Sequence, residues 1–387
     1  MLHGLTEEQE LIRNAAREFA ENEIAPKVAW MEETNEFPVE LMRRAGELGF
    51  TGIMFPEEYG GAGLGLTEFA LVLEEVSRVS QTFAICLDAS MTLCYLPILQ
   101  YGTEEQKQKY LPRACAGEIV GAACAGEAVG NTGNCMNHIT KAVKDGDEWV
   151  INGQKIFITN APFTDTFVVY ANANGASVPT LFIVDRDTPG LEIGNIEEKL
   201  GWHGSGTGTV NFTNVRIPAD NLLGEIDAAL DESISGVLES CIGIGAMCIG
   251  VASAVYSKTY EYVTTRETAG QKLIEHQAVA WDIARMAANI EQAVALVYQT
   301  TKFVDAGNTP VPGTPAGFLA STVKVQLPKM AQDACDVAIQ LHGGHGYMND
   351  MDIHRYWRDV RACSIGEGPT SNHLDFIALA ASVMKLF

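Results

Sequence analysis

Glu367 is the residue of this chain best placed to act chemically, because it lies between two glycines in the segment Ile365-Gly366-Glu367-Gly368. The segment follows an aromatic-rich stretch and offers the carboxylate neither a capping partner nor an obvious ion pair. Glycines carry no Cβ, so a reacting molecule can approach such a side chain closely. A lone glutamate in a glycine loop is also typical of a solvated turn. The alternative is a carboxylate that removes a proton from a substrate as a general base.

A second candidate is the strand Phe157-Ile158-Thr159-Asn160. The two-residue period of a strand places Phe157 and Thr159 on the same face. A flat aromatic ring with a hydroxyl beside it could support the isoalloxazine ring of a flavin, although an ordinary half-buried strand would have the same composition. Neither G-x-G-x-x-G nor G-x-x-x-x-G-K-[ST] occurs, so a nucleotide would have to be held without the dinucleotide fingerprint or a P-loop.

Histidine and cysteine spacings do not indicate a metal. His342-Gly-Gly-His345 has no acidic or thiolate side chains nearby, and its glycines favour close backbone approach to a ligand. The 9 cysteines are odd in number and form no C-x-x-C pair, which argues against a disulfide framework and a zinc site. We expect reduced thiols.

The pattern of the chain predicts an α+β, mainly α fold in which helices flank a small β domain. Residues 1–118 are expected to be helical, with Thr6 and Thr103 opening capping boxes and the first helix ending before Pro26. Between 119 and 225, short β-branched and aromatic runs predict an antiparallel β domain with turns at Asp145-Gly146-Asp147 and Asn152-Gly153.

Residues 226–387 are expected to be helical again. One apolar stripe recurs at steps of three and four and predicts a long helix, formed by Val279, Ile283, Met286, Ile290, Val294 and Val297. The segment 307–315 holds several glycines and prolines, so it should separate that helix from the next.

Composition excludes some classes of partner. The 387 residues carry 49 acidic against 26 basic side chains, a net charge of -23 that repels nucleic acid and anionic membrane surfaces. No uninterrupted apolar run reaches the ~20 residues that cross a bilayer. The amino terminus lacks the basic and apolar stretches of a secretory signal, and we expect a cytoplasmic protein.

Several segments, in their order and spacing, resemble the acyl-CoA dehydrogenase family over essentially the whole chain. They are Phe157–Asn160, Leu200–Ser205, Val215–Gly224, Arg266 to Gln277, Gln340–Tyr347 and Ile365–Gly368. The resemblance implies an N-terminal helical domain (1–118), a middle β domain (119–225) and a C-terminal four-helix bundle (226–387). It also implies FAD, an acyl-CoA substrate, an electron-transfer flavoprotein as partner and a homotetramer.

Within this resemblance, Glu367 falls on the base position of the motif usually written Y-E-G-T. The reaction removes a proton α to a thioester while a hydride leaves the β-carbon for flavin N5, and it needs a positioned base. Burial beside an apolar substrate should raise the pKa of that base toward neutrality.

The resemblance also assigns cofactor contacts. Phe157 would stack near the flavin and Thr159 would lie at its N5 edge. The remaining contacts are expected from Ala123, Ala125 and Gly126 at the ring, Thr132 near the pyrophosphate, Thr370 and Asn372 after the base, and Arg266, Gln277, Gln340, Gly343 and Gly344 to the FAD of a neighbouring subunit. The substrate contacts are expected from Asp88, Gly133, Glu239 and Gly366.

The chain departs from the family pattern near the base. Gly366 replaces the tyrosine of Y-E-G-T, and Pro369 is an added residue. The lost side chain could enlarge the acyl cavity, which suggests a branched, cyclic or aromatic acyl group. Some members carry their base on the first bundle helix, but that position is Cys241 here, and a thiol in an apolar helix is a poor base.

Asp88 is the second acid of interest, because the family template places its helix at the deep end of the acyl pocket. A carboxylate there is costly unless it is paired or functional. Asp88 could act as a second base, as in 1,4-dehydrogenation of a cyclic enoyl thioester. It could equally be a structural carboxylate bonded to Ser90 or Thr92.

Three readings of function remain open at this point. The first is an acyl-CoA dehydrogenase or an enoyl-CoA reductase, which share one site because the reaction is reversible. An acyl-CoA oxidase is the nearest rival, although such chains are usually longer. A non-catalytic assembly factor on the same scaffold is the third, and retention of Glu367 and Thr159 argues against it.

Overall fold

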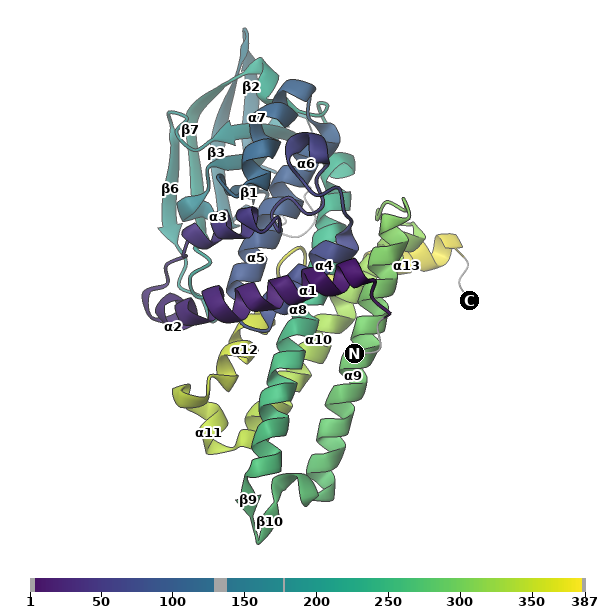
Figure 1. Cartoon of the computed structure of the whole chain (residues 1–387). Helices are drawn as coiled ribbons and strands as arrows, with labels where there is room; N and C mark the ends of the chain where they lie inside the picture. The colour runs from purple at the N-terminus through teal and green to yellow at the C-terminus, as the bar shows by residue number, and fades with distance from the viewer. Residues whose placement is uncertain (1–3, 129–137, 177, 385–387) are drawn as a thin grey trace.

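The structure is a computed structural model that describes residues 4–128, 138–176 and 178–384. A helical domain and a β-sheet lie side by side at one end, and the long helices of the C-terminal part extend away from them (Figure 1). The N-terminal helices contact both the sheet and the long C-terminal helices, and they contribute to the main hydrophobic core.

The N-terminal helices begin where the sequence predicted, but the first one does not end before Pro26. Helix α1 (Glu7–Phe19) starts at the Thr6 capping box, and the chain stays helical through a π-helical turn at Ala20–Ile24 into α2 (Ala25–Thr34). The expectation of a break was wrong because a π-helical turn directly before α2 accommodates Pro26 within a continuous helical stretch.

The remaining N-terminal helices pack beneath the sheet and against the bundle. They are α3 (Glu40–Glu47), α4 (Leu66–Ser77), α5 (Gln81–Ser90), a π-helical turn (Met91–Tyr95), α6 (Leu96–Tyr101) and α7 (Glu104–Cys115). Two helical stretches, Gln81–Tyr101 and Ile234–Thr265, are long and apolar enough to cross a membrane, but 89% and 83% of their apolar windows are buried inside the fold. Their composition is that of core helices.

The β domain is a mixed sheet rather than a purely antiparallel one. Its strands are β1 (Gly121–Cys124), β2 (Lys141–Asp145), β3 (Glu148–Ile158), β4 (Thr166–Ala173), β5 (Thr180–Asp185), β6 (Leu191–Ile196), β7 (Gly208–Pro218) and β8 (Leu222–Leu223). The order is β6-β7-β3-β2-β4-β5-β8, and β4 pairs in parallel with both β1 and β2. The other pairings are antiparallel.

One predicted turn is present and the other is not. Asp145-Gly146-Asp147 joins β2 to β3, as expected. Asn152-Gly153 instead lies inside β3, at a register shift against β7. A Cβ at Gly153 would stand 2.4 Å from the Thr140 hydroxyl oxygen, so this glycine is required by close packing inside a bulged strand.

The C-terminal part is built on α8 (Ala229–Thr265), α9 (Gln277–Asp305) and α10 (Pro315–His342), which lie side by side (Figure 1). The apolar stripe of α9 is buried as predicted, except that Val279 is half-buried, and the break at 307–315 is confirmed. The short strands β9 (Glu267–Thr268) and β10 (Gln271–Lys272) form a hairpin at the tip.

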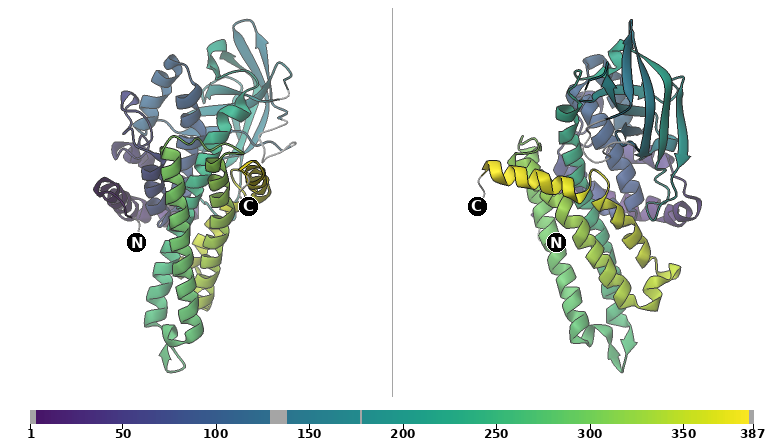
Figure 2. Two further views of the ribbon diagram at one scale, coloured as in Figure 1. Left: turned by 90° about the vertical axis from the view of Figure 1, so that its right-hand side faces the viewer. Right: turned by 180° about the vertical axis from the view of Figure 1, so that it is seen from behind.

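The chain ends with α11 (Gly344–Tyr347), α12 (Ile353–Val360), a 3-10 turn (Arg361–Ser364) and α13 (Thr370–Met384). Helix α13 packs on α10 but crosses the bundle at a large angle (Figure 2). The described cysteines are free and buried, and Cys135 lies outside the described residues.

Candidate active site

A cavity of about 990 Å³ opens where the sheet, α5, α8 and the loop before α13 meet. Its wall contains many of the predicted site residues, namely Ala123, Ala125, Gly126, Phe157, Thr159, Gly366, Glu367 and Asn372. These residues come from segments that lie up to 249 positions apart in the chain, from Ala123 to Asn372. The fold therefore brings the proposed base and the proposed flavin platform into one space.

Glu367 lines this cavity from a strained backbone. Its φ is 52°, in the left-handed region that side-chain-bearing residues rarely adopt, and Gly368 follows with φ 91°. Burial raises the pKa of the Glu367 carboxyl, and the positive charge of Lys324 acts in the opposite direction. The backbone conformation thus directs the Glu367 side chain into a partly dehydrated site.

The two glycines beside Glu367 have different reasons to be there. Gly368 needs its positive φ, whereas Gly366 has an ordinary φ, and a Cβ at Gly366 would meet only the Ala362 carbonyl oxygen at 3.8 Å. Residue 366 lines the cavity with room for a side chain. The absence of a side chain at this position therefore adds to the free volume of the site.

The end of β3 provides an exposed aromatic surface. Phe157 is 61% exposed, with φ 57°, and lies where β3 shifts register against β7 between Lys155 and Ile158. The strict alternation assumed from the sequence was wrong here, because the bulge lets Ile156 and Ile158 line the cavity together with Phe157 and Thr159. Both predicted residues nevertheless face the cavity.

Asp88 does not line the cavity, contrary to expectation. Ile85, Ala89 and Leu93 form this wall, because they recur every four residues on one helical face. Asp88 is fully buried on the side toward α8, where its Oδ2 accepts a hydrogen bond from the Ser240 hydroxyl at 2.6 Å. Burial holds the pKa of the Asp88 carboxyl well above its usual range.

Of the two partners predicted for the Asp88 side chain, Thr92 contributes a hydrogen bond that lowers the pKa of the carboxyl, whereas Ser90 bonds elsewhere. The Ser90 hydroxyl accepts a hydrogen bond from the Gly121 N–H, and the Thr92 hydroxyl donates to the Asp88 backbone carbonyl. Asp88 Oδ1 has no hydrogen-bond partner in the described part of the chain. The carboxyl is thus an interhelical group behind the cavity wall.

Glu239 and Cys241 of α8 also lie outside the cavity wall, which α8 supplies through Ile234 and Val237. Glu239 is half-buried, and burial followed by the charge of Asp305 raises the pKa of its carboxyl to about 7. Cys241 lies directly behind the base, with its Sγ 4.0 Å from the Glu367 carbonyl oxygen. Burial strongly raises the pKa of its thiol, so it is a poor base.

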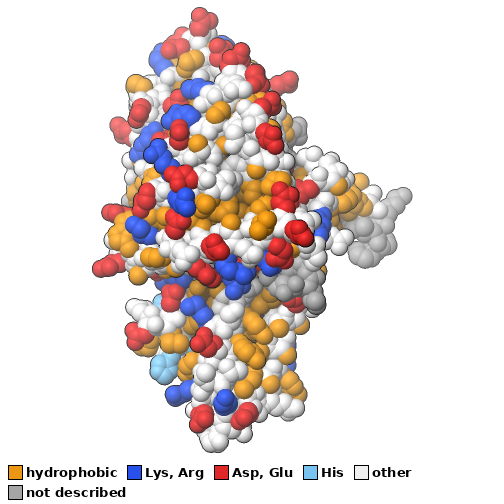
Figure 3. Space-filling view, viewed as in Figure 1, with side chains coloured by type: hydrophobic (Ala, Val, Ile, Leu, Met, Phe, Trp, Pro, Cys, Tyr) orange, Lys and Arg blue, Asp and Glu red, His pale blue; other side chains and the backbone are white. Residues whose placement is uncertain are grey.

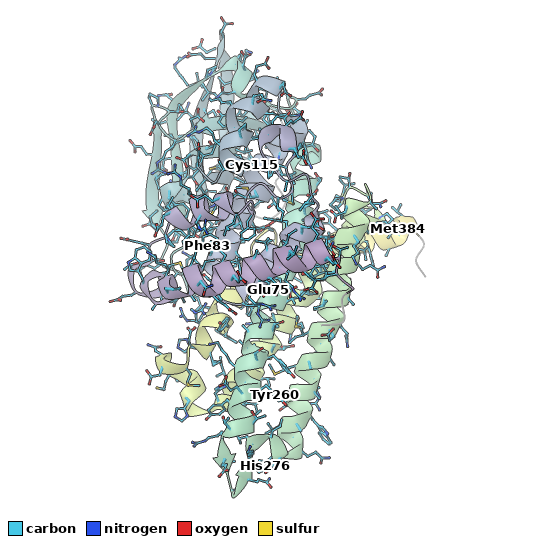
Figure 4. All side chains as sticks on the ribbon, in the orientation of Figure 1. Glu75, Phe83, Cys115, Tyr260, His276 and Met384 are labelled. Atoms are coloured by element: carbon cyan, nitrogen blue, oxygen red, sulfur yellow. The ribbon has the colours of Figure 1, made fainter. Side chains whose placement is uncertain are left out.

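A further group of predicted residues lies far from the cavity. Arg266 ends α8 and Gln277 begins α9 at the tip of the bundle, next to His276 in Figure 4. Gln340, Gly343 and Gly344 lie at the end of α10 near the same tip, where His342 stacks on Tyr262 with ring centroids 4.3 Å apart. In one subunit these residues do not contribute to the cavity wall.

Three more predicted residues have different outcomes. Thr370 begins α13 and is not in the cavity wall, although its neighbours Pro369 and Asn372 are. Thr132 and Gly133 lie outside the described residues.

His342 Nδ1 lies 2.7 Å from the Ala338 carbonyl oxygen, and no group of side chains able to hold a metal ion occurs in the described residues.

Sequence reasoning missed residues whose importance depends on tertiary contacts. Lys199 and Trp202 line the cavity, and Trp202 has φ 53° within the Leu200–Ser205 motif, which was noted only as a family signature. Lys324, behind the cavity wall, and His373, in that wall, contact the backbone around Glu367. No local pattern marks these two side chains, although a lysine within the apolar face of α10 is an unusual core residue.

The cavity fits a flavin by the chemistry of its wall. An isoalloxazine ring is flat and largely apolar with polar edges, and the wall offers an exposed phenyl ring, the Thr159 hydroxyl and the backbone around Ala123–Gly126. The acyl-CoA dehydrogenase N-terminal, middle and C-terminal domain models match residues 6–118, 125–215 and 233–381.

Individual proteins give the same result. The short-chain specific acyl-CoA dehydrogenase of Clostridium acetobutylicum is 37% identical, covering 94% of this chain and 95% of that protein. The caffeyl-CoA reductase-Etf complex subunit CarC of Acetobacterium woodii is 32% identical, with 94% and 95% covered. The butyryl-CoA dehydrogenase structure from Megasphaera elsdenii superposes with a TM-score of 0.93 at 31% identity, covering 99% of this chain and 100% of that one. With three domain models matched in order along the chain and full-length relatives above 30% identity, this protein belongs to the acyl-CoA dehydrogenase family.

Proposed function

We propose that this protein catalyses α,β-dehydrogenation of an acyl-CoA thioester, or the reverse reduction of an enoyl-CoA, with Glu367 as the base. The family is FAD-dependent, and its members are oxidoreductases acting on CH–CH bonds. The observation that carries the proposal is the presence of Glu367 in the same cavity wall as Phe157 and Thr159. A base and a flavin platform must share one space for this chemistry.

The chain's own residues perform the binding and the proton transfer. Phe157 would stack near the ring, the Thr159 hydroxyl would bond at its N5 edge, and the backbone of Ala123–Gly126 would hold its polar side. FAD, when bound, supplies the acceptor for the β-hydride. The carboxylate of Glu367 removes the α-proton, and its burial favours proton uptake because desolvation penalises the charged form.

The acyl group is proposed to be branched, cyclic or aromatic. The cavity wall near the base is apolar, and the space at Gly366 is open. A relative that is a caffeyl-CoA reductase supports an aryl acyl group within this fold. Straight short chains would leave much of such a cavity without contacts.

The direct test is anaerobic bleaching of the flavin absorption band. The FAD-loaded protein is mixed with butyryl-, isovaleryl-, cyclohexanecarbonyl- and 3-phenylpropionyl-CoA, and we expect the bulky thioesters to bleach it fastest. Glu367→Gln is the matched control, because it keeps the shape of the side chain but cannot take up the proton. Absence of bleaching with every thioester would contradict the dehydrogenase assignment.

An electron-transfer flavoprotein is the electron partner in this proposal. A relative named as part of an Etf complex supports an electron-transfer flavoprotein as partner. Rapid, stoichiometric formation of hydrogen peroxide in air would instead favour an acyl-CoA oxidase. A protein that fails to retain FAD would favour a non-catalytic assembly factor. The 1,4-dehydrogenation with Asp88 as base has little support, because Asp88 lies outside the cavity wall.

A homotetramer is proposed as the working form. The residues expected to reach FAD from a neighbouring subunit lie at the tip of the bundle, away from the cavity of their own chain. Apolar side chains gather over the lower helices in Figure 3, and Tyr260 and Trp281 on α8 and α9 are 48% and 54% exposed. Light scattering that gives the mass of one or two chains would contradict this assembly.

A further inference from the structure

The loop that carries Glu367 is held by two side chains, Lys324 behind the cavity wall and His373 in that wall. Lys324, from the middle of α10, donates from Nζ to the carbonyl oxygens of Cys363 at 2.7 Å and of Gly368 at 3.2 Å. His373, in the first turns of α13, has its Nε2 2.9 Å from the Glu367 carbonyl oxygen. These contacts span the strained turn on both sides of Glu367.

Lys324 is an unusual residue for this position because its charge is buried. Its side chain is only 1% exposed, and it makes no ion pair with a carboxylate in the described part of the chain. Burying an ammonium group is expensive, and a neutral donor could supply the same hydrogen bonds. The positive charge of Lys324 therefore needs a reason of its own. One effect of this charge is to lower the pKa of the Glu367 carboxyl.

Burial changes the pKa of several other titratable groups around the loop. Burial lowers the pKa of His373 on α13 to about 4 and raises that of the Cys241 thiol on α8. Burial also raises the pKa of the Asp88 carboxyl on α5, and the nearby charge of Glu367 contributes to that shift. Lys199 lines the same cavity and Arg361 donates to the Ser364 hydroxyl in the turn before the loop, but Lys324 is the cation that bonds to the loop backbone on both sides of Glu367.

We propose that Lys324 is a positioning residue for Glu367, which ties the two ends of the strained loop together and places a buried positive charge beside it. This inference rests on the proposed role of Glu367 as base. Lys324 does not line the cavity, so it acts only through Glu367. Lys324 thus contributes both hydrogen bonds to the loop and a positive charge. A substitution that removes only the charge separates the two contributions.

The test compares Lys324→Gln, which keeps a hydrogen-bond donor without the charge, with Lys324→Arg, which keeps the charge. Lys329→Met is the control, because Lys329 is an exposed lysine on the same helix that pairs with Asp333. The measurement is the pH dependence of anaerobic flavin bleaching by 3-phenylpropionyl-CoA, or by butyryl-CoA if that bleaches the wild type faster. A base must be ionised to act, so the acidic limb of the profile reports the ionisation of Glu367.

In Lys324→Gln we expect the acidic limb to move to higher pH by about one unit, since an opposite charge nearby favours the ionised form. In Lys324→Arg and Lys329→Met the limb should stay at the wild-type pH, with a lower plateau rate in Lys324→Arg alone. A purely structural role would lower the rate of Lys324→Gln equally at every pH, and that result would overturn the proposal.

Two further outcomes are separable. If the wild type is not bleached by either thioester, the proposed function fails before Lys324 is tested. If Lys324→Gln does not retain FAD, Lys324→Met is measured in its place, because it also lacks the charge: a limb displaced to higher pH supports the role of the charge, and a limb at the wild-type pH overturns it.

Discussion

Glu367 and Asp88 are two acids close to one cavity, the first half-buried and the second fully buried, and their backbones differ. Glu367 stands in a left-handed turn between two helices, lines the cavity and is held by side chains from α10 and α13. Asp88 stands in a regular helix, faces a neighbouring helix and bonds to Ser240. The difference indicates that irregular backbone, maintained by contacts elsewhere, is a better sign of a reacting acid than burial alone.

The largest expected effect is at the irregular acid. Glu367→Gln should slow anaerobic flavin bleaching by about 10³-fold, because the positioned general base is lost while the side-chain shape is kept. Stopped-flow absorbance gives the rate, and retained FAD confirms that the fold is intact. A bleaching rate within a few-fold of the wild-type rate would contradict the role of Glu367 as base. It would also mean that Glu367 and Asp88 do not differ in function.

The next effect concerns the space beside the base. Gly366→Tyr should lower the rate with 3-phenylpropionyl-CoA relative to butyryl-CoA by about 10- to 100-fold, because the new ring fills free volume in the acyl region. The two rates are measured on one preparation, so the ratio is independent of FAD content. An unchanged ratio would mean that residue 366 does not shape the acyl site.

The strained turn offers a matched pair of substitutions. Gly368→Ala should destabilise the loop by about 1 kcal/mol and slow bleaching several-fold, because alanine resists a positive φ. Gly366→Ala is the control, since residue 366 has an ordinary φ and open space. Rates and melting temperatures for the pair check this prediction, and equal effects in both variants would show that the turn conformation is unimportant.

The smallest effect on activity is expected at the regular acid. Asp88→Asn should change the bleaching rate by less than about three-fold, since the side chain lies outside the cavity. Its effect should appear in stability. The pKa of Asp88 is raised in the folded state, so its contribution is present at acidic pH and is lost as pH rises through that raised pKa.

Denaturant unfolding over a range of pH therefore checks Asp88→Asn. The wild type should lose free energy of unfolding more steeply than the variant as pH increases above the usual range of an aspartate. Parallel curves would show that Asp88 does not titrate differently on folding. A large loss of turnover would instead restore Asp88 as a catalytic candidate.

Periodic and capped elements were predictable from the sequence because their signals are local. The apolar stripe on α9, the Thr6 and Thr103 caps and the turn at Asp145–Asp147 are confirmed. The break at Pro26 and the turn at Asn152-Gly153 were wrong, since a π-helical turn and a packing contact with Thr140 decide those positions. The parallel pairing of β4 depends on long-range contacts that no local pattern encodes.

The site was predictable only where the resemblance supplied positions. It identified Glu367, Phe157 and Thr159, which do share a cavity, but it placed Asp88 on the wrong helix face. Lys324 was missed because its partners are backbone carbonyls near the end of the chain, about 40 residues away, which a sequence pattern does not reveal.

The most direct measurement of the central claim is proton exchange at the α-carbon of a bound thioester. The FAD-loaded protein is incubated without oxygen in deuterated water with 3-phenylpropionyl-CoA, and mass spectrometry follows deuterium at that carbon. We expect the wild type to exchange the α-proton and Glu367→Gln, with equal FAD content, to exchange it at least about 10³-fold more slowly. Exchange at the wild-type rate in Glu367→Gln would contradict the account.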